Sequence, residues 1–119
     1  MYTSATLSLA ALEYFVHLDA AQAPADLVAI PADVPDGVSR TRIEIRALPR
    51  HWRRYPAPEA LAELGTRWAD EGRTAMLVVP SAIVPAESNY LLNPRHADFV
   101  KIRVGSPEPF SFDPRMWKR

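Results

Sequence analysis

Two polar side chains of chemically active types stand in apolar surroundings. Glu13 lies within residues 3–19, TSATLSLAALEYFVHLD, where apolar residues recur at helical spacing. A carboxylate is costly to bury unless it is paired or functional, and in a low-dielectric pocket it can stabilise a developing positive charge. Ser81 directly follows the apolar run of residues 74–79 and its proline, and the exit of a buried strand is a common place for site residues. A carboxylate and a hydroxyl are thus the candidate catalytic groups.

Both residues also have plain structural interpretations, which position alone leaves open. Glu13 could point outward on an exposed helix face or cap a neighbour, and Ser81 could be an ordinary turn serine. No adjacent base that would activate Ser81 is evident, so we do not predict a nucleophile.

Standard signatures of other chemistries are absent from the sequence. It has no glycine-rich phosphate loop, no GxSxG elbow, no HExxH and no EF-hand pattern. Its three histidines lack ligand spacing, so no metal site is predicted. The lack of cysteine removes disulfides, thiolate zinc sites and cysteine nucleophiles.

Hydrophobic patterning predicts the elements that must position Glu13 and Ser81. Residues 3–19 predict a mostly buried helix with Thr3 or Ser4 as N-cap, and residues 57–71 predict a second helix. Residues 74–79, TAMLVV, predict a central strand buried on both faces. Residues 82–94 predict a long loop, with side-chain bonds to the backbone from Glu87, Asn89, Asn93 and His96. Further strands are predicted at residues 27–30, 40–47, 98–104 and 110–113.

The composition bounds the class of protein. A chain of 119 residues is sized for one domain, 1–119, and two helices with about five short strands predict an α+β fold with a mixed or mainly antiparallel sheet. Fourteen basic and fourteen acidic residues balance, which argues against direct nucleic-acid binding and favours self-association into a homo-oligomer. Neither a signal peptide nor a membrane span is evident, so we expect a soluble cytoplasmic protein.

Five motifs in one order resemble the RES domain family. Residues 8–18, SLAALEYFVHL, are similar to the family's helix, and residues 78–99, VVPSAIVPAESNYLLNPRHADF, to its Pro-Ser strand end and following loop. Between them lie Leu-Pro-x-x-Trp at residues 48–52 and Gly-x-x-Trp at residues 65–68, and Phe-Ser-Phe-Asp-Pro-Arg follows at residues 110–115.

The resemblance implies roles for three residues. The family's glutamate and serine match Glu13 and Ser81, which would be catalytic, while Tyr2 matches a tyrosine that would stack on nicotinamide or bond to the ribose. The family's arginine would lie upstream of Met1, so we expect a domain without its first strand or strands. Arg53, Arg54 and Arg95 could attract a pyrophosphate, although surface arginines are more often solvated.

What the family resemblance implies is an ADP-ribosyltransferase-like fold and cleavage of NAD between nicotinamide and ribose. The chain would be the toxin of a toxin–antitoxin system, an NAD phosphorylase, a glycohydrolase or an ADP-ribosyltransferase if active. NAD would be the substrate, with no separate cofactor. An Xre-type helix-turn-helix antitoxin would be the partner and would bind the DNA. Two alternatives are an inactive RES-domain remnant that binds other proteins and, more distantly, a simple nucleotide-binding or structural module.

Overall fold

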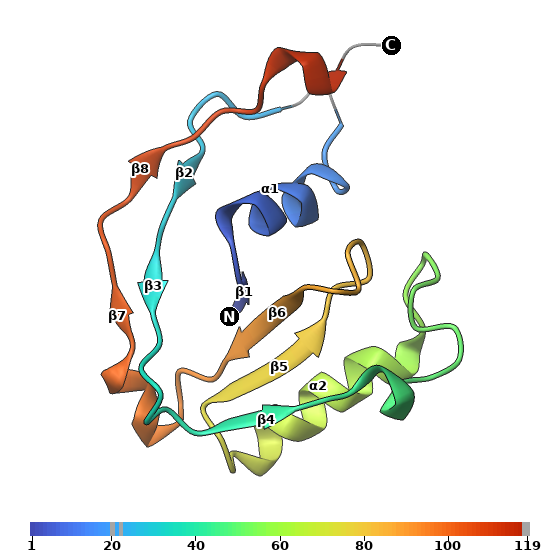
Figure 1. The fold of residues 1–119 in the computed structure, drawn as a ribbon, viewed down its shortest axis with the longest axis vertical. Coiled ribbons are helices and arrows are strands. Elements are labelled where there is room, and N and C mark those ends of the chain that lie inside the picture. The colour runs from blue at the N-terminus through green and yellow to red at the C-terminus, as the bar shows by residue number, and fades with distance from the viewer. Residues whose placement is uncertain (20, 22, 118–119) are drawn as a thin grey trace.

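A mixed four-stranded sheet forms the centre of the molecule. The computed structural model describes residues 1–19, 21 and 23–117. The strand order is β1 (Tyr2–Ser4), β6 (Ser88–Leu92), β5 (Met76–Pro80) and β4 (Arg40–Arg42), with β5 antiparallel to β6 and parallel to β4. Two helices and two short strand pairs surround this sheet (Figure 1). The α+β class with a mixed sheet is therefore confirmed.

Strand β5 is the central strand that its apolar run predicted. It is bonded on both sides, and Met76, Leu77 and Val78 are each at most 2% exposed. A run without alternation suits this position because both faces of the strand are covered. One face carries the main core, which consists of Val38, Ala75, Met76, Val78, Leu92 and Ile102.

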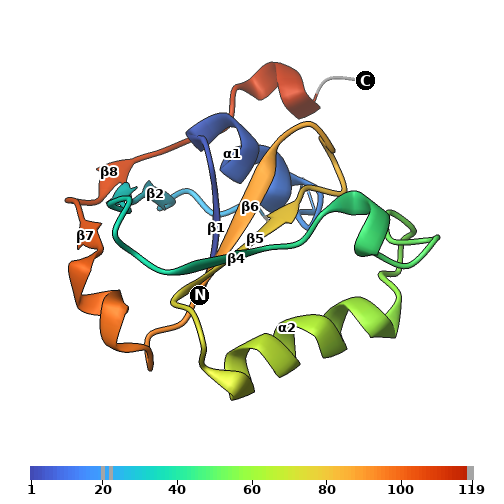
Figure 2. The same cartoon turned by 60° about the horizontal axis from the view of Figure 1, so that its bottom comes forward.

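Helix α2 (Glu59–Glu71) covers the other side of the sheet (Figure 2). A Cβ on Gly65 would lie 3.7 Å from the Leu91 side chain, and the Trp68 indole donates to Thr74 Oγ1 over 2.9 Å. The helix ends at Gly72, whose φ of 61° is left-handed and suits glycine. The second predicted helix is confirmed, with its start two residues later.

The first helix is shorter than predicted and less buried. Residues 2–4 form β1, which pairs antiparallel with β6, and α1 runs only over Leu7–Phe15. The N-cap is Thr6, whose Oγ1 accepts from the Leu9 amide over 3.1 Å, rather than Thr3 or Ser4. Leu9 is the one fully buried residue of α1. Local periodicity missed the strand because its partner, β6, lies more than 80 residues away in sequence.

Strand β6 lies inside the segment predicted to be a loop. Polar residues and prolines in residues 82–94 suggested a loop, yet Ser88–Leu92 pairs with both β1 and β5. Tyr90 and Leu92 pack toward the main core, while Leu91 contacts α2. Apolar residues of this strand thus face both sides of the sheet, so no alternation marks it, and the polar side chain of Asn89 is buried as well.

The remaining predicted strands are shorter than expected or absent. Residues 40–47 form β4 and then a 3₁₀ helix, η2 (Ile45–Ala47), because bonding to β5 ends with the Ile43 amide. Residues 98–104 fall largely in a 3₁₀ helix, η3 (Ala97–Lys101), which precedes β7 (Arg103–Val104). Residues 110–113 are not a strand, although β8 (Glu108–Pro109) lies just before them, and η4 (Pro114–Trp117) follows.

Two antiparallel pairs form a narrow ribbon beside the sheet (Figure 1). Strand β2 (Val28–Ala29) pairs with β8, and β3 (Ala32–Asp33) pairs with β7. The strand predicted at residues 27–30 is thus only two residues long, because the prolines on either side limit regular pairing. Across the part of the chain that is described, none of the helices has the length and apolar character needed to cross a membrane.

Candidate active site

Glu13 and Ser81 meet directly, although 68 residues separate them in sequence. The Ser81 hydroxyl donates to Glu13 Oε1 over 2.7 Å. Helix α1 lies beside β1, near the end of the sheet where β5 finishes and β6 begins (Figure 1). The helix therefore carries Glu13 to the point where the chain leaves the central strand.

The Ser81 hydroxyl is fully occupied by the protein. Besides donating to Glu13, it accepts from the amides of Ile83 and Val84, each over 3.1 Å. A hydroxyl has one proton to donate and two lone pairs, so this geometry uses all three. Ser81 is also 0% exposed. In this arrangement it acts on Glu13 and on the turn after β5, and has no bond left for a ligand.

Asn89 is the member of this cluster that the sequence interpretation missed. Its Nδ2 donates to Glu13 Oε1 over 2.7 Å and to the Tyr2 hydroxyl over 2.8 Å, and its Oδ1 accepts from Ser4 over 2.7 Å. Asn89 is 1% exposed. Its side chain bonds only to other side chains and to no backbone group. The prediction that Asn89 holds a loop through the backbone is therefore wrong. The three apolar residues that directly follow Asn89, residues 90–92, were the available signal for a strand.

The other polar residues of that segment have the expected structural roles in part. Asn93 Oδ1 accepts from the Arg95 amide, and His96 Nδ1 accepts from the Asp98 amide at the start of η3. Glu87 instead accepts from a side chain, Thr6, over 3.5 Å. None of these three contacts Glu13, so the chemistry-bearing cluster consists of Tyr2, Glu13, Ser81 and Asn89 with Ser4 behind them.

Tyr2 brings a phenol to the same carboxylate. Burial of the hydroxyl, followed by the nearby negative charge of Glu13, raises the pKa of Tyr2 above its ordinary value, and the bond from Asn89 opposes this in part. The residue is nevertheless 60% exposed as a whole. The phenol stays protonated throughout the neutral range, and Asn89 occupies one of its lone pairs. Its proton is therefore available to donate to a ligand.

The two oxygens of Glu13 have different surroundings. Oε1 accepts two short bonds, from Ser81 and Asn89, whereas Oε2 accepts none from the described residues. No buried side-chain oxygen in the described part of the chain is left without a partner, so Oε2 reaches accessible surface. Two neutral donors orient the carboxylate without neutralising it, because neither carries a charge. The arrangement fixes the position of the Glu13 carboxyl group and leaves one of its oxygens at accessible surface.

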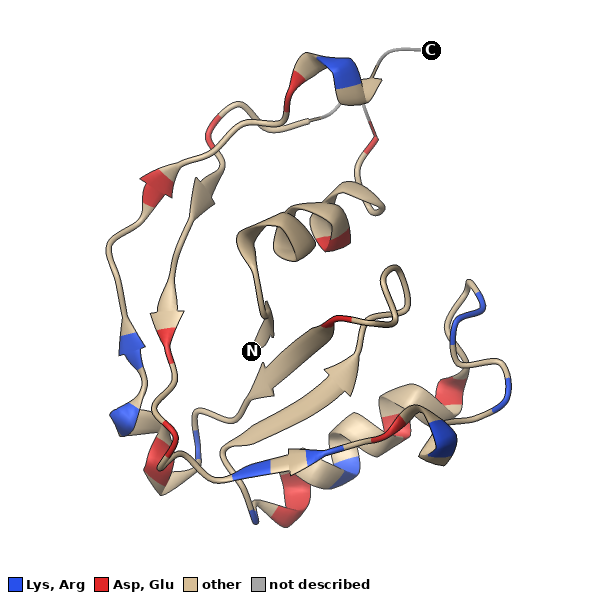
Figure 3. Cartoon of the chain, in the orientation of Figure 1, with Lys and Arg blue, Asp and Glu red and all other residues tan. Residues whose placement is uncertain are grey.

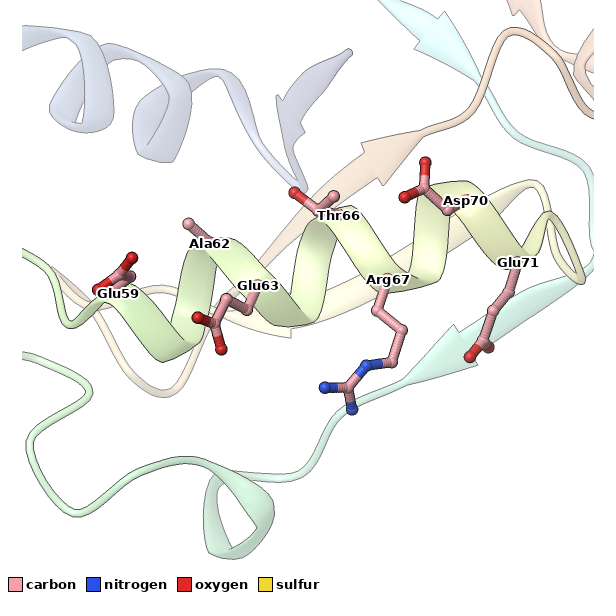
Figure 4. A pocket seen from close by; sticks show the side chains of 7 residues that line it. All are labelled: Glu59, Ala62, Glu63, Thr66, Arg67, Asp70 and Glu71. Atoms are coloured by element: carbon pink, nitrogen blue, oxygen red, sulfur yellow. The ribbon is translucent and has the colours of Figure 1, made fainter.

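Neither of the two best-defined hollows of the described structure includes Glu13. The larger, about 560 Å³, is an open surface along one helix (Figure 4), lined by Glu59, Ala62, Glu63, Thr66, Arg67, Asp70 and Glu71. All its walls come from α2, so it is not a cleft between elements. The smaller, about 120 Å³, lies at the end of β5 beside Pro80 and Ser88 and is below the ~300 Å³ of a typical ligand pocket. Within the described residues no three histidine, aspartate or glutamate side chains gather as metal ligands would.

Comparisons with known proteins show which family the chain resembles in sequence. The chain matches the RES domain family over residues 1–113. It is 36% identical over 122 residues to the "Prs ADP-ribosylating toxin" of Sphingobium sp. (strain YBL2), an alignment that covers 100% of this chain and 75% of that protein. It is 34% identical to a "Toxin Res" of Yersinia enterocolitica, covering 98% and 76%, and 36% identical to a "Toxin Res" of Pseudomonas putida, covering 98% and 79%.

The chain is a member of the RES domain family. Its two helices and mixed sheet are consistent with the ADP-ribosyltransferase-like fold that the motifs implied. The residues that match the family's glutamate and serine motifs are the two that share a hydrogen bond here.

Proposed function

We propose that this chain is a toxin that cleaves NAD at the bond between nicotinamide and ribose, with Glu13 as its catalytic carboxylate. The observation that carries the proposal is the carboxylate held by two neutral donors on Oε1 while Oε2 reaches the surface. The names of the relatives, which include "Toxin Res" and "Prs ADP-ribosylating toxin", support the toxin role.

The reaction needs a fixed negative charge more than it needs a proton donor. The nicotinamide ring of NAD is positively charged, and it leaves with the electron pair of the ribose C1′–N bond as neutral nicotinamide. Positive charge then develops on the ribose as an oxocarbenium ion, which a carboxylate close to the ring stabilises. A nucleophile attacks C1′ and loses its proton, which balances the reaction.

The neighbours of Glu13 would keep its charge in place. Ser81 and Asn89 orient one oxygen, so little reorganisation of the carboxylate is needed as the ribose charge grows. Ser81 acts here as a positioning residue, because its hydroxyl has no free bond for the substrate. Tyr2, which is partly exposed and protonated, would donate to the ribose or pack on the nicotinamide ring.

The acceptor of the ADP-ribosyl group defines a second candidate activity. Attack by phosphate or water would give NAD phosphorolysis or hydrolysis. Attack by a protein side chain would give ADP-ribosylation, and the relative from Sphingobium, named as an ADP-ribosylating toxin, favours testing this route. Both routes break the same C1′–N bond, so Glu13 would have the same role in each.

A toxin of this kind would need a protein that controls it. We propose an Xre-type helix-turn-helix antitoxin as the partner, which would cover the site and bind the DNA. Co-expression of such a neighbouring protein should restore growth to cells in which this chain is toxic. Continued growth arrest in its presence would contradict this assignment.

Nicotinamide release from NAD tests the proposal. Purified chain is incubated with NAD, with and without phosphate, and Glu13→Gln is the informative variant because its carbonyl oxygen can still accept from Ser81 and Asn89. Loss of the charge should lower the rate about 10²–10³-fold, as expected for one preorganised electrostatic contact. Glu63→Gln, on the exposed face of α2, is the matched control and should leave the rate unchanged.

The outcomes separate the proposed activity from the alternatives. If wild type and Glu63→Gln release nicotinamide while Glu13→Gln does not, Glu13 carries the chemistry. Equal release by Glu13→Gln would overturn its role. Absence of release from the wild type would favour a RES domain that binds other proteins without consuming NAD. Mass spectrometry of the products then distinguishes phosphate, water and protein as acceptors.

A further inference from the structure

Positive charge is concentrated in one loop of a chain that is neutral as a whole. Residues 46–54, called here the basic loop, contain Arg46, Arg50, His51, Arg53 and Arg54 and no acidic residue. Figure 3 shows blue stretches along the segment between η2 and α2, as well as on β4, β7 and other elements, whereas four of the residues that line the open surface of α2 are acidic. Among the described residues, none of the ion pairs involves this loop, because the three pairs use Arg73, Lys101 and Arg115. Its charge is therefore not neutralised within the described structure.

The basic loop is ordered by its own contacts. The Trp52 amide donates to the Pro49 carbonyl over 3.0 Å, and the Arg54 amide donates to the His51 carbonyl over 2.9 Å. Trp52 is half-buried, while the arginines and His51 are exposed. Two successive turns thus present cationic side chains from a backbone of defined shape.

One bond ties the basic loop to the site. Arg53 Nε donates to the carbonyl of Ala82 over 2.8 Å. Ala82 is the residue after Ser81, so two hydrogen bonds and one peptide link connect this guanidinium to the Glu13 carboxylate. The bond uses one of the five N–H donors of Arg53 and leaves both terminal amino groups free for a planar, two-point contact.

We propose that Arg53, with the basic loop around it, binds the pyrophosphate of a dinucleotide whose nicotinamide ribose lies against Glu13. This inference rests on the proposed cleavage of NAD and adds where the phosphates bind. The negative charge of a pyrophosphate complements the positive charge of the basic loop. In NAD the pyrophosphate is joined to the nicotinamide ribose through a single C5′ methylene. Arginine is suited to this task because its fork matches two phosphate oxygens at once. The bond to Ala82 fixes the direction of the fork relative to Ser81.

A substrate series provides the kinetic test. Arg53→Ala should raise the KM for NAD about tenfold, the loss expected for hydrogen bonds to a charged group, with a smaller change in kcat. The same variant should cleave nicotinamide riboside, which has no phosphate, as the wild type does. Arg103→Ala, on β7 in the ribbon, is the matched control and should behave as the wild type with both substrates. Arg53→Lys keeps the charge without the two-point guanidinium contact, so its KM for NAD should lie between those of the wild type and Arg53→Ala.

A binding experiment decides the proposal independently of activity. Inorganic pyrophosphate is titrated into ¹⁵N-labelled chain, and the amides of residues 50–54 and 82 should shift, with the shifts weakened in Arg53→Ala and unchanged in Arg103→Ala. If the wild type releases no nicotinamide but pyrophosphate still shifts these amides, pyrophosphate binding by the basic loop is supported and the proposed NAD cleavage is contradicted. If NAD is cleaved and Arg53→Ala matches Arg103→Ala in KM and in the titration, the loop proposal fails and the catalytic one stands. Folding of Arg53→Ala is verified from its unchanged amide spectrum away from the loop.

Discussion

The hydrogen bond from Asn89 to Glu13 can be inverted by exchanging donor and acceptor. Asn89→Asp is nearly isosteric but places a carboxylate oxygen where an amide now donates over 2.7 Å. Two carboxylates at that distance cannot both remain ionised, so the folded state must take up a proton. The combined pKa of the pair is then raised in the folded state. The loss of stability therefore grows as the pH rises above the carboxyl pKa of the unfolded chain.

The size of this effect follows from proton uptake. With an ordinary carboxyl pKa of about 4 and about 1.36 kcal/mol per pH unit, the variant should lose roughly 4 kcal/mol of stability at pH 7 and roughly 1.4 kcal/mol at pH 5. A loss of 4 kcal/mol is a large part of the 5–15 kcal/mol typical of a domain, so the variant should be handled near pH 5. The bond from Ser4 to position 89 can persist, because a carboxylate oxygen still accepts it.

Adding Glu13→Gln to Asn89→Asp should restore part of the stability and remove its pH dependence. In the double variant the new amide nitrogen at position 13 donates to the new carboxylate at position 89, whereas Ser81 loses its acceptor, because Ser81 and Asn89 both donate to the same Oε1 in the wild type. Urea unfolding followed by circular dichroism at pH 5, 6 and 7 gives the four free energies of the cycle. Additive losses in the double variant, or a penalty for Asn89→Asp that is equal at pH 5 and pH 7, would refute the geometry described for this site.

Two further predictions test the surroundings of the site and the fold. The phenol of Tyr2 should titrate above its reference pKa of 10.0 in ring-carbon NMR, and Glu13→Gln should lower that pKa because it removes the negative charge that helps to raise it. Titration of Tyr2 at the reference value in the wild type would contradict the burial of its hydroxyl. Gly72→Ala should cost about 1 kcal/mol in chemical denaturation because φ is 61°, whereas Gly37→Ala, whose added Cβ meets nothing within 4 Å, is the control and should cost less; equal losses would show that the left-handed cap of α2 is unimportant.

Elements with a continuous or regularly spaced apolar pattern were predictable from the sequence. Strand β5 is apolar throughout because both faces and both edges are covered, and α2 shows its inner stripe because only one side is packed. Both patterns are local, so a short window of sequence contains them. The motifs that contain Glu13 and Ser81 are also contiguous stretches of sequence, so they can be recognised without any tertiary contact.

Strands β1 and β6 were not predictable because no local apolar pattern marks them. Each is short and carries polar residues, and the backbone bonds between the two strands join segments more than 80 residues apart in sequence. Ser4, Asn89 and Tyr2 are polar because they contact one another and Glu13, not because they face solvent. A local reading interprets such residues as a helix cap or a loop.

The sequence by itself determined which residue types were available: one acid in an apolar helix, one serine after a buried strand and a loop rich in arginine. Tertiary structure alone decided that the serine bonds to the acid, that Asn89 joins them to Tyr2, and that Arg53 reaches the turn beside them. Hydrogen bonds of 2.7–2.8 Å depend on sheet register and helix placement, which arise from contacts between distant segments.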